Sequence, residues 1–253
     1  DHGDPGGDPV MTELYWYEHA ALPWLALLQA LPLAAAALLW RLGESRLAAN
    51  LGRLAAGLEL LLALALYRDH PVHAAGFRHA EYLDLLGPLA YHAGADGVSV
   101  LFILLGALIV FLVTLYSLVR GLPDMARLLA VVLAIEGIMM SLLTTLNLLW
   151  FVLASGVELA LVGYLIGRWS SSPDKDTAKA RFYQFQGIGL AMLLAGTLVL
   201  GWHHHDIAAA AWSFDLIDLA SRPVPAAMGS AAFFLLFYGL GVRTPIFPLH
   251  GWL

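Results

Sequence analysis

Three ionisable side chains lie within or next to stretches that are otherwise apolar, and they are the first candidates for chemistry. Glu136 and Glu158 each lie near the middle of an apolar run, and Arg243 directly follows another. An unpaired carboxylate is costly in hydrocarbon, so such a group must bind a proton or find an opposite charge. This pattern favours a proton relay with Arg243 as the counter-ion, although the same residues could simply hold helices together.

Two prolines and a histidine follow Arg243. A helix that reaches Arg243 would be interrupted by Pro245 and Pro248, and His250 comes directly afterwards. Irregular backbone within a membrane is tolerated only where protein or a water-filled cavity surrounds it. His250 could extend a proton path or could cap a turn, and the sequence favours neither. The predicted proton-transfer (catalytic) residues are therefore Glu158, Arg243, Glu136 and His250.

Other polar residues are weaker candidates. Glu59 stands alone in an early apolar run, so a transport role for it is less convincing. The run from His203 to Asp206 has the composition of a metal site. Three adjacent His residues cannot all face one ion from regular backbone, so we expect a solvated loop and no metal. Polar residues near the two central Glu residues would more often join helices than carry protons, and they are Ser141, Thr144, Thr145, Asn147 and Ser155.

The composition indicates a membrane protein. Of the 253 residues, 60% are hydrophobic and 13% are charged, with a mean hydropathy of +0.75, whereas soluble domains carry about 25% charged residues. The net charge of −6 makes a nucleic-acid partner unfavourable. The absence of Cys excludes disulfides and thiolate metal sites. No phosphate-binding loop or nucleophile elbow is recognisable in the sequence.

The apolar runs predict an all-α, polytopic transmembrane helix bundle of about seven spans, with the seventh helix broken by prolines. A span needs roughly 20 apolar residues. The candidates are Leu22–Trp40, Leu47–Tyr67, Val98–Val119, Met125–Leu143, Leu146–Gly167, Phe182–Trp202 and Val224–Val242. They make one transmembrane domain, residues 22–253, after a polar N-terminal tail, residues 1–21, that we expect to be disordered.

Basic residues predict the orientation of these spans. Cytoplasmic loops are enriched in Lys and Arg, and nine of the thirteen basic residues fall in three alternate loops or in the adjoining ends of the spans: Arg41, Arg46, Arg53, Arg120, Arg127, Arg168, Lys175, Lys179 and Arg181. The N-terminus is then outside, in a bacterial inner membrane. Two long outer segments remain. We expect Arg68–Gly97 to form a hairpin or a surface helix, and His203–Arg222 to lie along the membrane surface.

Four stretches, in order, resemble the antiporter-like membrane subunits of respiratory complex I of the chain 4 (M) type, which are related to subunits of multisubunit Na⁺/H⁺ antiporters. The most specific resembles the family's Lys-x-Pro-x-x-Pro-x-His-x-Trp-Leu-Pro signature. The stretches are Tyr91–Val100, Ile135–Met139, Leu146–Trp169 and Val242–Leu253. Family members contain a second inverted repeat, so the chain resembles their N-terminal half, truncated after the signature.

The resemblance implies a charge pair. In the family, a Glu of the fifth helix pairs with a Lys of the seventh, and the pair modulates proton loading. Glu158 and Arg243 are the matching residues here. Arg stays protonated and cannot relay a proton as Lys can, but it can still control the charge of Glu158. An ungapped match would instead place Gly156 at the family's Glu. Two helix positions differ by about 200°, so the sequence leaves open whether position 156 or 158 faces Arg243.

The resemblance also implies a function. It implies a proton-translocating membrane subunit of a complex I-like NADH:quinone oxidoreductase, which couples electron transfer to H⁺ movement. No cofactor is expected in this chain; FMN, iron–sulfur clusters and quinone are expected in partner subunits. Expected partners are other membrane subunits and the lipid bilayer. The alternatives are a subunit of a cation/proton antiporter or inorganic-carbon uptake complex without its own redox chemistry, and a membrane scaffold that has lost transport.

Overall fold

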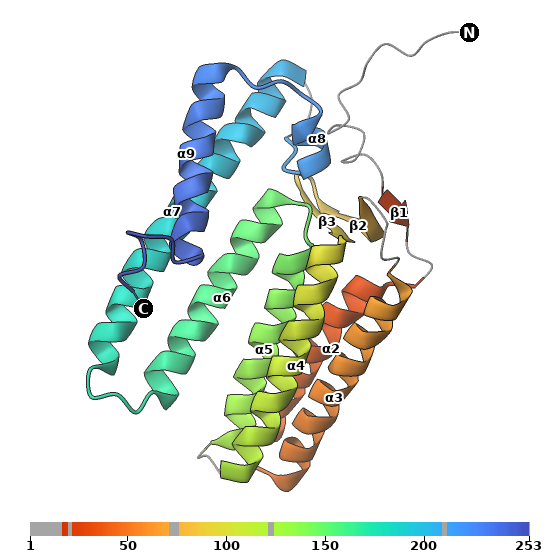
Figure 1. The fold of residues 1–253 in the computed structure, drawn as a ribbon, viewed down its shortest axis with the longest axis vertical. Coiled ribbons are helices and arrows are strands. Elements are labelled where there is room, and N and C mark those ends of the chain that lie inside the picture. The colour runs from red at the N-terminus through yellow and green to blue at the C-terminus, as the bar shows by residue number, and fades with distance from the viewer. Residues whose placement is uncertain (1–16, 20–21, 71–75, 121–123, 209–211, 253) are drawn as a thin grey trace.

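The computed structural model describes residues 17–19, 22–70, 76–120, 124–208 and 212–252 (Figure 1). Within them, seven helices are long and apolar enough to cross a membrane. They are α2 (Trp24–Leu42), α3 (Arg46–Asp69), α4 (Gly97–Arg120), α5 (Met125–Thr144), α6 (Leu148–Trp169), α7 (Lys175–Ala208) and α9 (Ala226–Arg243). The predicted polytopic helix bundle with seven spans is confirmed, and the chain is an integral membrane protein.

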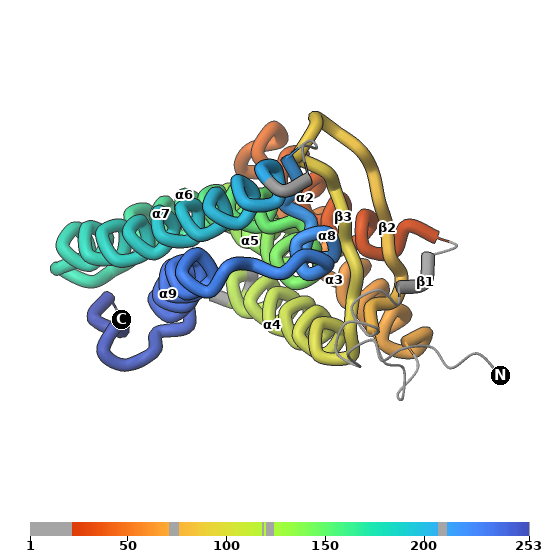
Figure 2. The backbone as a smooth tube through the Cα atoms, turned by 90° about the horizontal axis from the view of Figure 1, so that it is seen from above, coloured from red at the N-terminus to blue at the C-terminus, as the bar shows by residue number. Residues whose placement is uncertain are grey.

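The seven helices form two packed groups joined by α6. Helices α2 to α5 pack together around two clusters of buried apolar side chains. Helices α7 and α9 pack along each other, and α6 contacts both α5 and α7 (Figures 1 and 2). Helices α3, α5 and α7, which follow the basic loops, all begin at the same end of the molecule (Figure 1).

A small sheet covers the opposite end of the α2–α5 group. Strands β2 (Phe77–Leu86) and β3 (Leu89–Ala95) form an antiparallel hairpin, which confirms the hairpin alternative for this outer segment. Gly87 in the turn has a φ of +55°, a conformation that suits glycine. Strand β1 (Tyr17–His19) pairs in parallel with β2. The predicted disordered tail is therefore wrong for these three residues, because they pair with the otherwise free edge of the hairpin; the rest of the tail up to residue 21 lies outside the described residues.

Carboxylates from neighbouring segments cap two of the membrane helices. Glu81 of β2 accepts hydrogen bonds from the backbone N–H groups of Leu25 (2.7 Å) and Ala26 (2.9 Å) at the start of α2. Glu44 accepts from Ala126 (3.2 Å) and Arg127 (3.3 Å) at the start of α5. Negative charge at a helix N-terminus satisfies unpaired donors and complements the helix dipole. Burial raises the pKa of the Glu81 carboxyl, although its donors favour the ionised form.

The break between α5 and α6 is tied to the sheet and to the short helix α8 (Leu216–Ala220). The backbone N–H of Leu146 donates to the carbonyl of His92 (2.7 Å), and its own carbonyl accepts from Leu216 (2.8 Å). The Asn147 side chain accepts from the N–H of Trp150 (3.0 Å) and so begins α6. A buried hydrogen bond joins Nδ1 of His92 and Oδ2 of Asp215 beside it. These contacts fix the start of α6 relative to the sheet and α8.

Helix α7 is longer than predicted and includes the histidine run. Its 34 residues extend about 51 Å, well beyond the roughly 30 Å hydrocarbon core. The predicted solvated loop at His203–Asp206 is wrong: the run is helical, and His203 and His204 are buried. The following segment folds back on the helix. His203 Nε2 lies 3.2 Å from the carbonyl of Pro223, and His205 stacks on Trp212 with ring centroids 5.5 Å apart.

Glycines let α7 and α9 approach closely. A Cβ atom on Gly239 of α9 would lie 2.7 Å from Cγ of Leu193 and 2.9 Å from the carbonyl oxygen of Gly189, both on α7. Cβ atoms essentially never come this close to a non-bonded heavy atom, so only glycine fits without a shift. The contact lies one helical turn before Arg243 on α9. It therefore determines where the Arg243 side chain lies relative to α7.

We expect Gly239→Ala to lower the thermal stability of the protein, because the added methyl forces apart two packed helices at a cost of about 1–3 kcal/mol. The measurement is thermal unfolding of the purified protein in detergent. Gly187→Ala in α7 is the matched control. A Cβ there would meet no neighbouring atom within 4 Å, so the change should not destabilise the protein and helix propensity favours Ala. Equal unfolding temperatures for Gly239→Ala and Gly187→Ala would contradict the close-packing argument.

Candidate functional site

Glu158 and Arg243 form an ion pair between α6 and α9. The Nη2 group of Arg243 donates a hydrogen bond to Oε2 of Glu158, and the two side chains are only 19% and 24% exposed. Position 158, and not position 156, therefore faces Arg243. A Cβ on Gly156 would instead approach Leu190 of α7 at 3.6 Å, as expected from the roughly 200° rotation between the two positions. The structure thus decides the alternative that the sequence left open.

A cavity of about 210 Å³ lies beside the ion pair. Its volume leaves room for several water molecules, each of which occupies about 30 Å³ in the liquid. It is lined by Glu158, Leu159, Val162, Phe182, Gln186, Arg243 and Trp252. Gln186 is buried, so an amide that can donate and accept hydrogen bonds stands within the apolar wall. The pair and the amide together supply polar contacts for water at this place.

The segment after α9 folds back over the pair. Helix α9 ends at Arg243, and the described residues beyond it form turns through Trp252, so the helix is interrupted at the prolines. The indole Nε1 of Trp252 donates to the carbonyl of Val242 (3.0 Å), and its ring packs edge-on against Phe182 of α7, with centroids 5.7 Å apart. Trp252 therefore forms one wall of the cavity.

Sequence reasoning missed the aromatic and amide neighbours of the pair. The guanidinium carbon of Arg243 lies 6.0 Å from the ring centroid of Phe151, within the range of a cation–π contact. Phe151 precedes Glu158 by seven residues, so helical spacing places both on one face of α6. Phe182 and Gln186 are likewise one turn apart on α7. Helical periodicity around Glu158 could have found Phe151, but nothing in the sequence identifies α7 as the facing helix.

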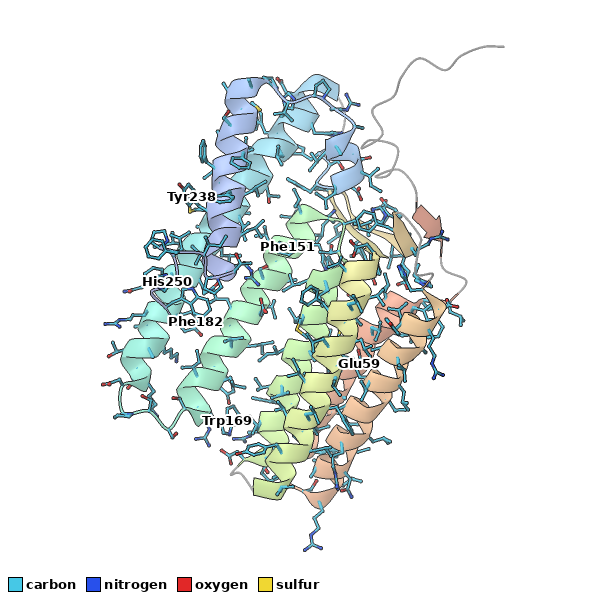
Figure 3. All side chains as sticks on the ribbon, viewed as in Figure 1. Glu59, Phe151, Trp169, Phe182, Tyr238 and His250 are labelled. Carbon is cyan, nitrogen blue, oxygen red and sulfur yellow. The ribbon has the colours of Figure 1, made fainter. Side chains whose placement is uncertain are left out.

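His250 does not join the ion pair. Its side chain is exposed, its ring lies 5.5 Å from that of Phe247, and it does not line the cavity. Figure 3 shows it with Phe182 on the side of the molecule formed by α7 and α9. A role for His250 in proton transfer therefore remains a prediction.

Glu136 lies in a different place, within the α2–α5 group. Its side chain has no exposed surface, and neither carboxyl oxygen has a hydrogen-bond partner in the described part of the chain. It is absent from the lining of the Glu158–Arg243 cavity. The predicted site residues thus divide between two locations, with Glu158 and Arg243 together and Glu136 apart.

Glu59, one of the weaker sequence candidates, has a second buried carboxyl near it. Its side chain on α3 is also fully buried, both its oxygens lack hydrogen-bond partners in the described part of the chain, and its carboxyl interacts electrostatically with that of Glu136. Helices α3 and α5 pack against each other. Figure 3 shows Glu59 among these helices, away from Phe182 and His250. Glu59 is alone in its own apolar run, and only the tertiary packing reveals Glu136 as its neighbour.

The polar residues near the central glutamates mostly join helices. Ser141 accepts from the indole N–H of Trp150 (2.8 Å), and Thr144 accepts from the amide of Gln29 (3.2 Å). Asn147 begins α6, as described above. Ser155 differs, because its hydroxyl oxygen is buried and has no hydrogen-bond partner among the residues that the structure describes. It precedes Glu158 by three residues and lies on a neighbouring part of the same helix face.

Comparison with known proteins gives a consistent result. No family model matches the chain. NADH-quinone oxidoreductase subunit 13 of Thermus thermophilus is 35% identical over 208 residues, which cover 80% of this chain and 41% of that protein. The NAD(P)H-quinone oxidoreductase chain 4 1 of a Picosynechococcus species is 29% identical, covering 76% of this chain and 35% of the relative. The chain is thus similar in sequence to part of these NADH-quinone and NAD(P)H-quinone oxidoreductase subunits.

Solved structures agree with this relationship. A chain of respiratory complex I from Thermus thermophilus with bound NADH superposes with a TM-score of 0.77 and 31% identity, over 90% of this chain and 46% of that one. A chain of the Mrp complex from a Dietzia species gives a TM-score of 0.74 at 20% identity, over 92% of this chain and 43% of that one, which shows the shared fold alone. The chain spans less than half the length of these relatives, which fits the N-terminal half expected from the resemblance.

We expect the two members of the ion pair to be coupled in stability. Arg243→Ala should destabilise the protein by up to about 3 kcal/mol, because it leaves a carboxylate without its counter-charge in a mostly buried place. The double variant Arg243→Ala/Glu158→Gln should be more stable than Arg243→Ala alone, because the stranded charge is also removed. Thermal unfolding in detergent measures both.

The exposed ion pair between Arg168 and Asp124 is the matched control for this measurement, since half of the Arg168 side chain is exposed. Arg168→Ala should cost no more than about 1 kcal/mol. Additive effects of the Arg243 and Glu158 substitutions would show that the two groups are not coupled.

Proposed function

We propose that this chain is part of a proton-translocating membrane subunit of a complex I-like NADH:quinone oxidoreductase, with the Glu158–Arg243 pair as a site of proton loading. The observation that carries the proposal is a carboxylate and a guanidinium paired across two membrane helices, beside a cavity large enough for water. Intramembrane ionisable residues of this kind mark ion pathways by default. The relationship to complex I subunits supplies the redox partner that would drive the movement.

The charges of the pair define what it can do. Arg243 keeps its proton, so Glu158 is the member that changes protonation. In the structure the guanidinium donates to the Glu158 carboxylate. A change that withdraws the guanidinium would leave Glu158 to take a proton from water in the cavity. Returning the guanidinium would release that proton. Movement of Arg243 relative to Glu158 is then the gating step.

In this scheme Glu136 is a second proton-binding residue. It precedes Thr145 by nine residues, and Glu158 follows Asn147 by eleven, so the two carboxyls lie about 14 and about 17 Å below the same break between α5 and α6. Since α5 packs against α6, a proton passing between them would travel sideways and not across the membrane. Ser155, with its unpartnered hydroxyl, lies on α6 near Glu158 and could hold a bridging water.

The proposal assigns the redox chemistry to other subunits. FMN, iron–sulfur clusters and quinone would be held there, and this chain would carry no redox centre of its own. Its partners would be other membrane subunits and the lipid bilayer, with no nucleic acid. The subunit would lie in a bacterial inner membrane. Its N-terminus would be outside, because the basic residues follow or precede the starts of α3, α5 and α7, and these three helices begin at the same end of the molecule (Figure 1).

The second candidate function is a subunit of a cation/proton antiporter or an inorganic-carbon uptake complex without its own redox chemistry. This second function is supported by the fold that the chain shares with a chain of the Mrp complex, although that likeness concerns the fold alone. The two functions differ in what drives transport. Proton movement that starts on addition of NADH and stops with a quinone-site inhibitor supports the first function, and movement driven only by an imposed ion gradient supports the second.

We expect Glu158→Gln to lower NADH-driven proton uptake into inside-out membrane vesicles at least about tenfold, because the only titratable member of the pair is lost. Arg243→Lys should keep most of the uptake, since a cation remains, and Arg243→Ala should lose it. Assembly is checked by the amount of the intact complex in the membrane. Arg168→Ala, which breaks an exposed ion pair outside the site, should pump like the wild type. Wild-type uptake by Glu158→Gln or by Arg243→Ala would overturn the role of the pair.

A further inference from the structure

A second pair of ionisable groups lies in the α2–α5 group, away from the Glu158–Arg243 cavity. Glu59 of α3 and Glu136 of α5 have no exposed surface at all, and their four carboxyl oxygens have no hydrogen-bond partner among the described residues. The two carboxyls interact electrostatically. Each is therefore a fully buried carboxyl without a hydrogen-bond partner among the described residues, and the other is its ionisable neighbour.

No opposite charge neutralises this pair within the described residues. The basic side chains that the structure describes on the surrounding helices are exposed, namely Arg41 on α2, Arg46, Arg53 and Arg68 on α3, and Arg127 on α5. Arg53 is six residues from Glu59, about 9 Å along the helix axis, and its guanidinium donates to Asn50 instead. Two carboxylates without a counter-cation cannot both remain ionised in hydrocarbon, because each charge loses its hydration and repels the other.

The surroundings of the pair are apolar on both sides. On α3, Ala56 belongs to one hydrophobic cluster and Ala63 to the other, and Glu59 lies between them. On α5, Leu133 and Met140 flank Glu136 in the same way. The two carboxyls therefore form a single polar layer between two apolar clusters. A metal ion would need more oxygen ligands than this layer provides, and no group of three or more His, Cys, Asp or Glu suited to a metal occurs in the described part of the chain.

We infer that Glu59 and Glu136 form a proton-binding site that is separate from the Glu158–Arg243 pair and exchanges its protons with water. A protonated carboxyl is neutral, so binding a proton removes the cost of an unpaired buried charge at each position. Titration then belongs to the two groups together and not to either alone. The inference that the pair binds protons is based on its burial and on the packing of α3 against α5. The further inference that it takes part in transport rests on the proposed function.

Infrared spectroscopy of the purified membrane complex tests the binding site. Protonated carboxylic acids have a carbonyl band that ionised carboxylates lack. We expect the wild type at neutral pH to show such a band, part of which is lost in Glu59→Gln and part in Glu136→Gln, with both parts lost in the double variant. The band should shift in D₂O. Glu44→Gln is the control, because Glu44 is an exposed carboxylate between α2 and α3 that accepts a hydrogen bond from the start of α5, and it should leave the band unchanged.

Two spectroscopic outcomes would overturn the inference. If the spectra of the wild type and the Gln variants agree in this region, the carboxyls are not protonated. If the band does not shift in D₂O after turnover, the protons are sealed in and the pair is only structural. If the double variant fails to assemble, either single variant still shows whether its carboxyl is protonated.

Proton uptake by the same variants tests the transport role separately. We expect Glu59→Gln to reduce NADH-driven uptake in membrane vesicles several-fold while Glu44→Gln pumps like the wild type. A Glu59→Gln variant that loses its part of the band but pumps normally would overturn the transport role and leave the binding site intact. Normal pumping by Glu158→Gln would instead overturn the proposed function, and the infrared result would still decide the binding site.

Discussion

An ionisable group in hydrocarbon needs either a counter-charge or a proton, because the bilayer offers no water to stabilise a lone charge. This constraint governs both groups of helices. In one, Arg243 supplies the counter-charge to Glu158, and the close approach of α7 and α9 at Gly239 brings it there. In the other, Glu59 and Glu136 have no cation in the described residues and must hold protons. The fold thus separates a charged pair from a pair that is kept neutral.

The sequence predicts the spans well because their signal is local. A run of about 20 apolar residues satisfies its own backbone hydrogen bonds only as a helix, whatever lies beside it. The same logic locates the interruption after Arg243, since Pro245 and Pro248 lack the N–H groups that a helix needs. The choice between positions 156 and 158 is different. It depends on the rotation of α6 relative to α9, and the break at Leu146, tied to His92 and Leu216, fixes α6 in its place.

The features that the sequence did not predict all depend on contacts between segments that are distant in sequence. No local pattern links Glu59 to Glu136, because their encounter depends on how α3 packs against α5. The histidine run reads as polar and therefore as a loop, yet the helix continues through it, since Pro223 and Trp212 return to contact His203 and His205. Likewise, Trp252 reaches the ion pair only because the chain turns back after α9. Tertiary packing overrides composition at each of these places.

The arginine at position 243 restricts the charge states of its site. With Glu158 ionised the pair is neutral, and with Glu158 protonated it carries one positive charge, because the guanidinium does not lose its proton. A lysine would add a third route, in which the cation itself is discharged. Loading a proton here therefore creates an uncompensated cation, which is stable only if Arg243 moves toward water or another anion. Its position favours such a movement: it is the last residue of α9, it is followed by turns, and its long side chain already borders a cavity.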